Sequence, residues 1–206
     1  MELLLQIWGG SCYLSNKILF AFGARGGLSR NRWNIAGWLI YLIGVPAWVV
    51  ILLGHGNWIA ASVEAGGIPA MLLGLFNSLR KTHKPRKIVN LLVLLCTYGA
   101  LALGLSYSIL LNGGIASITQ LLEIGVMLGF LLGSYCLARN NQLGWIFFML
   151  MNTSMATLMF MQGKPILSGQ QLLSLAFVIY GFSRARKNNR GKKQITLPAA
   201  PATSDL

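Results

Sequence analysis

The chain has 206 residues, of which 55% are apolar and only 10% are charged, and its formal net charge is +13. So few charged side chains exclude ordinary soluble domains, in which about a quarter of the residues are charged. A soluble chain this basic would suggest a nucleic-acid partner, but here the charges are confined to a few segments between long apolar runs, so we expect no nucleic acid.

Seven segments are apolar over the ~20 residues that a helix needs to cross the hydrocarbon core of a bilayer. They are 3–23, 33–54, 57–79, 88–112, 115–138, 143–162 and 166–184. Backbone polar groups must pair with one another inside lipid, and runs this long do not match the alternating strands of a barrel. The predicted fold is therefore an all-α membrane protein with seven transmembrane helices.

The first segment lacks the basic start and the small-residue cleavage site of a signal peptide, and we expect it to span the membrane. It carries Lys17 near its end. Two interpretations are open for this lysine. Its stem could lie along apolar surface while the ammonium reaches the interface, or the ammonium could pair with an intramembrane carboxylate.

The second and third segments contain helix-disturbing residues. Pro46 lies inside the second segment, where it removes a backbone hydrogen bond. In the third segment, Glu64 is followed by Gly66-Gly67 and Pro69, so this helix is not expected to be straight. A basic linker that includes His83 follows, whereas His55 lies in the turn on the opposite side.

Basic residues gather in alternate loops. Of the 17 lysines and arginines, 15 lie in the first, third and fifth loops and the tail, at positions 25, 30, 32, 80, 81, 84, 86, 87, 139, 184, 186, 187, 190, 192 and 193. Basic loops stay in the cytoplasm, which predicts an N-terminus outside and a C-terminus inside. The tail 188–206 is polar, then Ala/Pro-rich, and is predicted to be disordered.

The stretch 144–187 is predicted to form a helical hairpin with polar residues on its inner face. Such residues are costly in lipid unless they face a cavity or a partner; they are Asn152, Gln162, Gln170, Gln171 and Tyr180. Trp145, Phe148 and Asn152 share one helical face. The two aromatic residues could stack on the ring of a solute while Asn152 binds the edge of that ring. Alternatively, Trp145 could lie at the membrane interface, Phe148 could be a packing residue, and Asn152 could form an interhelical hydrogen bond.

The same plan occurs earlier in the chain at a fixed offset of 107 residues. Gly37-Trp38 matches Gly144-Trp145, Gly74 matches Gly181, and Trp38-x-x-Tyr41 matches Trp145-x-x-Phe148. Two three-helix repeats of the same orientation need a linker helix between them. We therefore predict repeats at 1–81 and 113–187, joined by a basic loop and linker helix at 82–112.

Chemistry that would indicate an enzyme is absent from the sequence. No metal-binding or nucleophile motif occurs, and the three cysteines are expected to be buried small hydrophobes. Only two carboxylates, Glu64 and Glu123, are intramembrane. This pattern predicts a binding cavity rather than a catalytic site, with no cofactor and no metal.

The order of motifs in the C-terminal half resembles the PnuC family of bacterial vitamin transporters. The residues that carry the resemblance are Ala138-Arg139-Asn140-Asn141, Trp145-x-x-Phe148-x-x-x-Asn152, Gln162-Gly163, Ser168 to Gln171 and Tyr180-Gly181. The family's second Trp is Phe148 here, and Val45 stands where the repeat would put a second Asn. The resemblance implies a full-length SWEET-like fold in the bacterial inner membrane.

The resemblance also implies the function. It predicts facilitated diffusion of a ring-containing vitamin or nucleoside-like solute, foremost nicotinamide riboside, trapped by a cytoplasmic kinase, in a protein that could form trimers among membrane lipids. Trp38, Tyr41, Trp145 and Phe148 would stack the ring, Asn152, Gln162, Gln170 and Gln171 would bind its polar groups, and Glu64, Glu123 and Tyr180 would complete the lining. A sugar carrier of the same architecture and a non-transporting membrane scaffold are the alternatives, and a membrane enzyme is a more distant one.

The predicted orientation can be tested by cysteine labelling from outside the cell in a background without the native cysteines. We expect a membrane-impermeant maleimide to label His55→Cys and not His83→Cys, because basic loops are retained in the cytoplasm. Labelling of His83→Cys alone would reverse the orientation.

Overall fold

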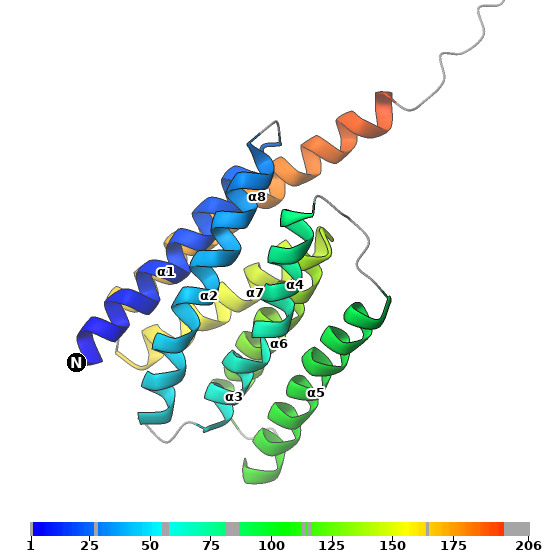
Figure 1. Ribbon diagram of the computed structural model, residues 1–206. Coiled ribbons are helices and arrows are strands. Elements are labelled where there is room, and N and C mark those ends of the chain that lie inside the picture. The colour runs from blue at the N-terminus through cyan, green and yellow to red at the C-terminus, as the bar shows by residue number, and fades with distance from the viewer. Residues whose placement is uncertain are drawn as a thin grey trace, which may run out of the picture.

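The computed structural model of the protein describes residues 2–26, 29–54, 58–80, 87–112, 114, 117–163 and 165–195. Across these ranges the regular elements are all α-helices (Figure 1). They are α1 (Glu2–Gly23), α2 (Arg30–Gly54), α3 (Trp58–Gly66), α4 (Ile68–Leu79), α5 (Lys87–Asn112), α6 (Ile118–Ala138), α7 (Leu143–Met161) and α8 (Pro165–Ile195). The predicted all-helical fold class is confirmed.

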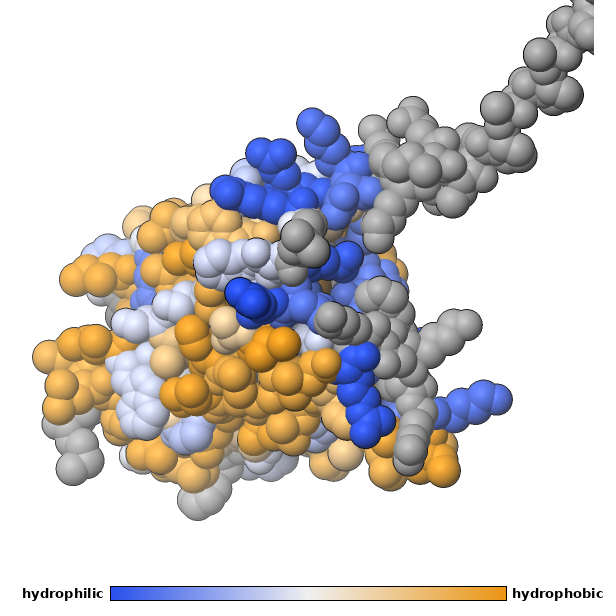
Figure 2. Space-filling model, turned by 45° about the horizontal axis from the view of Figure 1, so that its top comes forward, coloured by the Kyte–Doolittle hydropathy of each residue, from blue (hydrophilic) through white to orange (hydrophobic). Residues whose placement is uncertain are grey.

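Five of the helices in the described ranges, α2, α5, α6, α7 and α8, are long and apolar enough to cross a membrane. Much of their surface is apolar and exposed, as on α5, where Leu91, Leu95 and Leu103 are each more than half exposed. Figure 2 shows a mainly hydrophobic face, with hydrophilic residues gathered toward the end from which the grey tail leaves. These features define a multi-pass membrane protein.

Turn residues set where the last three helices begin and end. The Ser117 side chain caps α6 by accepting a hydrogen bond from the Gln120 backbone N–H at 3.2 Å. Asn140, at φ 56°, makes the left-handed turn between α6 and α7. Gly163, at φ 69°, follows α7, and Pro165 then opens α8 in the pattern typical of helix boundaries.

The third predicted segment is broken, as its glycines and proline indicate. A turn at Gly67 separates α3 from α4, and a side chain there would clash with Phe130, because an added Cβ would lie 2.5 Å from the ring. By contrast, α2 continues through Pro46 as one helix. The turn at 55–57 and most of the basic linker, 81–86, lie outside the described residues.

The last helix is longer than the sequence predicts. It extends to Ile195, into the segment 188–206 for which we expected disorder. Residues 183–195 have no proline and only one glycine, so a helix already formed in the membrane-facing part can continue through residues that favour helix in water. Residues 196–206 lie outside the described part of the chain.

The helices pack as two groups of matching pattern, the N-terminal group (α1–α4) and the C-terminal group (α6–α8). Inside the groups, α1 packs on α2 and α2 on α4, as α6 packs on α7 and α7 on α8. Between the groups, α1 packs on α8 and α4 on α6, while α5 lies outside against α3, α4 and α6 (Figure 1).

One tertiary contact occurs in both groups at equivalent positions. The Trp38 ring of α2 lies directly over Gly74 of α4, and the Trp145 ring of α7 lies directly over Gly181 of α8. Each tryptophan is almost fully buried, at 3% and 4% exposure. Because both members of the second pair follow those of the first by 107 positions, the weak sequence offset corresponds to a repeated contact.

The Trp–Gly contacts predict which glycines tolerate a methyl group. A Cβ on Gly181 would lie 2.5 Å from the Trp145 ring, so Gly181→Ala should destabilise the protein by roughly 1–3 kcal/mol through overpacking. Gly169, in the same helix, has open space around it, so Gly169→Ala should be neutral or slightly stabilising. Thermal unfolding in detergent measures both, and equal midpoints for the two variants would contradict the close packing.

Candidate functional site

The most unusual side chain in the interior is Lys17 of α1, which is fully buried at 0% exposure. Its ammonium Nζ lies 3.6 Å from the centre of the Phe148 ring, 4.7 Å from that of Tyr41 and 5.0 Å from that of Tyr13. Cation–π contacts are each worth ~2 kcal/mol or more when they are desolvated. Three rings from three helices therefore form an aromatic cage around one ammonium.

Hydrogen bonds hold the cage in place. The hydroxyl oxygens of Tyr13 and Tyr41 lie 3.2 Å apart, and the two rings meet edge to face with centroids 5.2 Å apart. The Tyr41 hydroxyl also lies 3.5 Å from Ser134 Oγ of α6, and the Tyr13 hydroxyl donates to Met151 Sδ of α7 at 3.8 Å. The cage thus joins the N-terminal group to the C-terminal group in the interior.

The ammonium has no hydrogen-bond acceptor among the described residues. Glu64 is the acidic residue that interacts with it electrostatically, and it stands at the end of α3, just before the break at Gly67. One Glu64 carboxylate oxygen, Oε1, is also buried without a partner. Broken helices of this kind line the solute sites of many transporters.

Further buried polar atoms in the described part of the chain are left without partners. They are both side-chain polar atoms of Asn16, Asn77 Oδ1, Trp48 Nε1, Asn152 Oδ1, Gln171 Oε1 and Ser174 Oγ. Leaving such a group unpaired costs about 1–3 kcal/mol. Asn152 is fully buried, and its Nδ2 donates only to the Phe148 carbonyl of its own helix, at 2.6 Å. Its oxygen is therefore available to an external donor.

The repeat brings matching side chains to this interior. Tyr41 and Phe148, both fully buried, flank the Lys17 ammonium from α2 and α7. Glu64 of α3 and Gln171 of α8, which are also separated by 107 positions, each have an unpaired buried Oε1. We call Tyr13, Lys17, Tyr41, Glu64 and Phe148 the central cluster.

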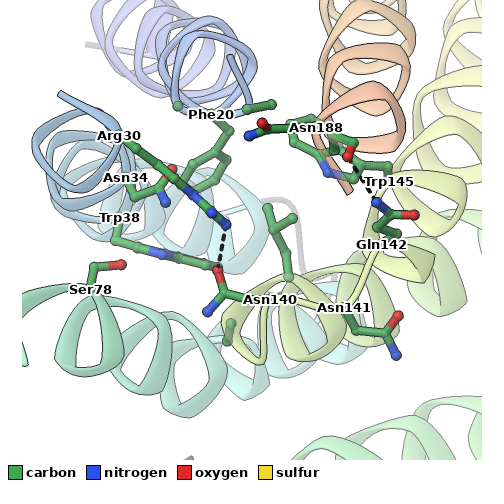
Figure 3. A pocket seen from close by; sticks show the side chains of 15 residues that line it. Phe20, Arg30, Asn34, Trp38, Ser78, Asn140, Asn141, Gln142, Trp145 and Asn188 are labelled. Atoms are coloured by element: carbon green, nitrogen blue, oxygen red, sulfur yellow. Dashed lines mark hydrogen bonds between the residues drawn. The ribbon is translucent and has the colours of Figure 1, made fainter. Parts of the chain in front are cut away.

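A cavity of about 80 Å³ opens at the basic end of the molecule, between the two groups (Figure 3). Trp38 and Trp145 line its sides, and Arg30 extends across it to donate to Asn140 Oδ1 at 3.4 Å. Its other polar lining comes from Asn34, Ser78, Asn141, Gln142 and Asn188. The cavity is smaller than the roughly 300–1,000 Å³ of typical small-molecule sites, so it fits an entrance better than a complete site.

Hydrogen bonds cross between the groups beside this cavity. Arg25 Nε donates to the Tyr180 hydroxyl at 2.8 Å, and Asn77 Nδ2 donates to the Ala138 carbonyl at 2.9 Å. Closer to the middle of α1, Gln170 Nε2 donates to the Gly10 carbonyl at 2.8 Å. The two groups are thus bonded to each other both beside the cavity and further along α1.

The structure places some of the site residues predicted from the sequence in the central cluster, beside it or at the cavity, and places the others elsewhere. Tyr41, Glu64 and Phe148 come together in the central cluster, and Asn152 lies one turn beyond Phe148. The two tryptophans line the cavity, and Gln171 is buried in α8 at 7% exposure.

Four of the predicted residues lie elsewhere. Glu123 is exposed on α6, and Gln162 is exposed in the turn after α7. Gln170 is engaged by the Gly10 carbonyl. Tyr180 accepts hydrogen bonds from Arg25 and Arg184 at the basic end.

Sequence reasoning left Lys17 and Tyr13 out of the predicted site. For Lys17 the signal was a charge inside an apolar segment, for which two interpretations stayed open. Its complete burial excludes a lysine that reaches the interface, and its electrostatic interaction with Glu64 fits the alternative of an intramembrane partner. Tyr13 lies four residues earlier on the same helical face.

Comparisons of the chain with protein-family models, with curated proteins and with solved structures found no match. Within the described residues, no group of three or more His, Cys, Asp or Glu side chains could hold a metal ion. The fold and the interior therefore define the class, a multi-pass helical membrane protein with a buried aromatic and polar cluster between two helical groups.

Proposed function

We propose that the chain crosses the membrane seven times, as two parallel three-helix repeats joined by α5. With 22 residues, α1 is about 33 Å long, enough for a hydrocarbon core of about 30 Å. The hydropathy of α1 is lower than that of the five candidate spans because α1 contains polar residues such as Asn16 and Lys17, and these two are buried in the interior rather than exposed to lipid. Together α3 and α4 provide the third crossing. The repeated Trp–Gly contact and the matching helix pairs support this arrangement.

We infer that the protein is a carrier for facilitated diffusion of a ring-containing vitamin or nucleoside-like solute across the bacterial inner membrane. The observation that carries this proposal is the central cluster, in which aromatic faces and unpaired polar atoms meet at the interface of the two groups. Rings that stack on Tyr41 and Phe148 would find hydrogen-bond partners in Asn152, Gln171 and Glu64. Exchange of the hydrogen bonds between the two groups would open the site to one side of the membrane and then to the other.

The resemblance to the PnuC family makes nicotinamide riboside the first solute to test, with a cytoplasmic kinase as the trapping step. The orientation proposed from the basic loops puts the cavity between Trp38 and Trp145 on the cytoplasmic side. Solute released through it would meet the kinase there. No cofactor enters this scheme.

Asn152 provides the sharpest test of the site. Since its amide bonds only its own helix, Asn152→Leu should leave thermal stability nearly unchanged. If Oδ1 accepts from the solute, the variant should lose roughly 1–3 kcal/mol of binding, a 5- to 150-fold rise in Kd. Isothermal titration of purified protein with nicotinamide riboside, thiamine and riboflavin measures this loss. Phe148→Trp, which restores the family's second Trp, should keep or improve binding of a flat ring.

The matched control is Thr157→Val in the same helix. Thr157 also hydrogen-bonds the carbonyl four residues earlier, at 3.0 Å, but its side chain is exposed. The Thr157→Val variant should bind the solute with the same affinity as the wild type. Equal affinities in all three proteins would mean that Asn152 is structural and that the solute binds elsewhere; binding of sugars instead of vitamins would favour the sugar carrier.

A further inference from the structure

The cavity at the basic end has a lining that fits an anion. Among the described residues that line it, Arg30 is the charged one and none is acidic. Its volume of about 80 Å³ is several times the roughly 10–15 Å³ that one water molecule needs. The cavity is thus too small to enclose a ring-containing solute, but it is large enough for a small polyatomic anion.

The guanidinium of Arg30 has unused hydrogen-bond donors. A guanidinium carries five N–H donors, and the partner of Arg30 among the described residues is the neutral Asn140 Oδ1, at 3.4 Å. That distance is long beside the usual ~2.9–3.0 Å. The side chain is partly buried, and Figure 3 shows it extending from α2 across the cavity to Asn140. A guanidinium in this setting is suited to an oxyanion, which it can bond through two parallel hydrogen bonds.

Amide side chains from both helical groups accompany Arg30 in the lining. Asn34 lies one turn further along α2, and its Oδ1 packs against Gly23 of α1, so its amide nitrogen is the open end of the side chain. Asn188 lines the cavity from α8, and its Nδ2 faces Gly26, just after α1. Both amides carry N–H donors. An anion bound at Arg30 would therefore have donors from the N-terminal and the C-terminal group within the same cavity.

Basic residues stand around this lining. Arg25, Arg139 and Lys187 are each next in the chain to a residue that lines the cavity, and all three are exposed. Figure 2 shows hydrophilic residues gathered toward this end of the molecule. Clustered charges of one sign raise the local concentration of ions of the opposite sign, so the surroundings favour the approach of an anion.

We propose that this cavity is a binding site for a phosphate group, in which Arg30 bonds the phosphate oxygens from α2 and Asn188 donates to them from α8. The phosphate would replace the long Arg30–Asn140 contact and hold the two groups together at this end. A soluble phosphate compound and the headgroup of an anionic lipid share this chemistry, and the experiment below distinguishes them. The inference goes beyond the proposed function and does not depend on the solute that the protein carries.

Such a site would give the proposed carrier a response to its own product. A kinase that traps the solute makes a phosphate monoester on the side to which the cavity opens. This compound, bound at Arg30, would occupy the proposed path of release and slow the passage of further solute. That consequence rests on the proposed function, whereas the phosphate site itself does not.

Isothermal titration of the delipidated protein in a phosphate-free detergent buffer of constant ionic strength measures the site. We expect inorganic phosphate and glycerol 3-phosphate to bind, and phosphate to raise the thermal unfolding midpoint above that in chloride. Arg30→Gln should weaken phosphate binding at least about tenfold, because it removes the charge and the paired donors. Arg32→Gln is the matched control, since Arg32 is exposed in the same helical turn and does not line the cavity; its affinity should stay within about twofold of the wild type.

Dioctanoyl phosphatidic acid in the same titration identifies the source of the phosphate. Binding of the soluble compounds that depends on Arg30 assigns the site to phosphates dissolved in water, and binding of the lipid alone that depends on Arg30 assigns it to a headgroup. No binding of any of the three compounds overturns the proposal. So does equal weakening by Arg30→Gln and Arg32→Gln, which would indicate only general attraction to a basic surface.

A second variant keeps the test decisive if Arg30→Gln does not fold. Asn188→Ala removes the donor from the other group and should weaken phosphate binding at least about threefold. Unchanged affinity in Asn188→Ala would contradict a site that bridges the two groups. None of these titrations contains a vitamin, so their failure would leave the proposed function standing, and a failure of vitamin binding would leave the phosphate site standing.

Discussion

The structure depends on one constraint, the absence of water around most of its surface. In lipid each polar group must find its partner within the protein, and here polar side chains of α1, α7 and α8, among them Asn16, Asn152 and Ser174, are buried in the interior. Lys17 is the extreme case: a fully buried ammonium enclosed by three aromatic rings and opposed by Glu64. A buried pair of charged residues is weak evidence for a role in stabilising the fold, because apolar residues can often replace such a pair without a loss of stability. We propose instead that the cluster serves to bind the solute.

Small residues let the two helical groups build this interior. The tryptophan of α2 fits over a glycine of α4, and the tryptophan of α7 fits over a glycine of α8, which brings the helices of each pair close together. A turn at Gly67 separates α3 from α4 close to Glu64, so the carboxylate lies at the end of a helix and not within a continuous one. The two groups are similar in packing but not in chemistry: Lys17 has an isoleucine, Ile124, at the equivalent position, and Asn152 corresponds to Val45. The central cluster is therefore asymmetric.

Much of the helical layout could be predicted from the sequence, because long apolar runs and glycine or proline breaks are local signals. The helical boundaries agree within a few residues except in α8, where polar helix-forming residues extend the helix past its apolar part. The inward face of α7 followed from the spacing of Phe148 and Asn152. The surroundings of Lys17 did not, since they depend on how α1 packs against helices that are distant in sequence. Glu123, chosen as an intramembrane carboxylate, is exposed on a helix surface, and Gln162, chosen for its polarity and for the resemblance, is exposed in a turn, because polarity does not determine direction.

The most direct test of the central claim is a counterflow measurement in liposomes that contain the purified protein. Vesicles loaded with an unlabelled vitamin are diluted into a trace of the same labelled compound, with no ion gradient and no kinase. A carrier with one alternating site between its two helical groups predicts that preloading speeds entry of label, which overshoots transiently before it equilibrates. Entry no faster than into protein-free vesicles, for every ring-containing vitamin and for sugars, would contradict the account and favour a membrane protein that transports nothing.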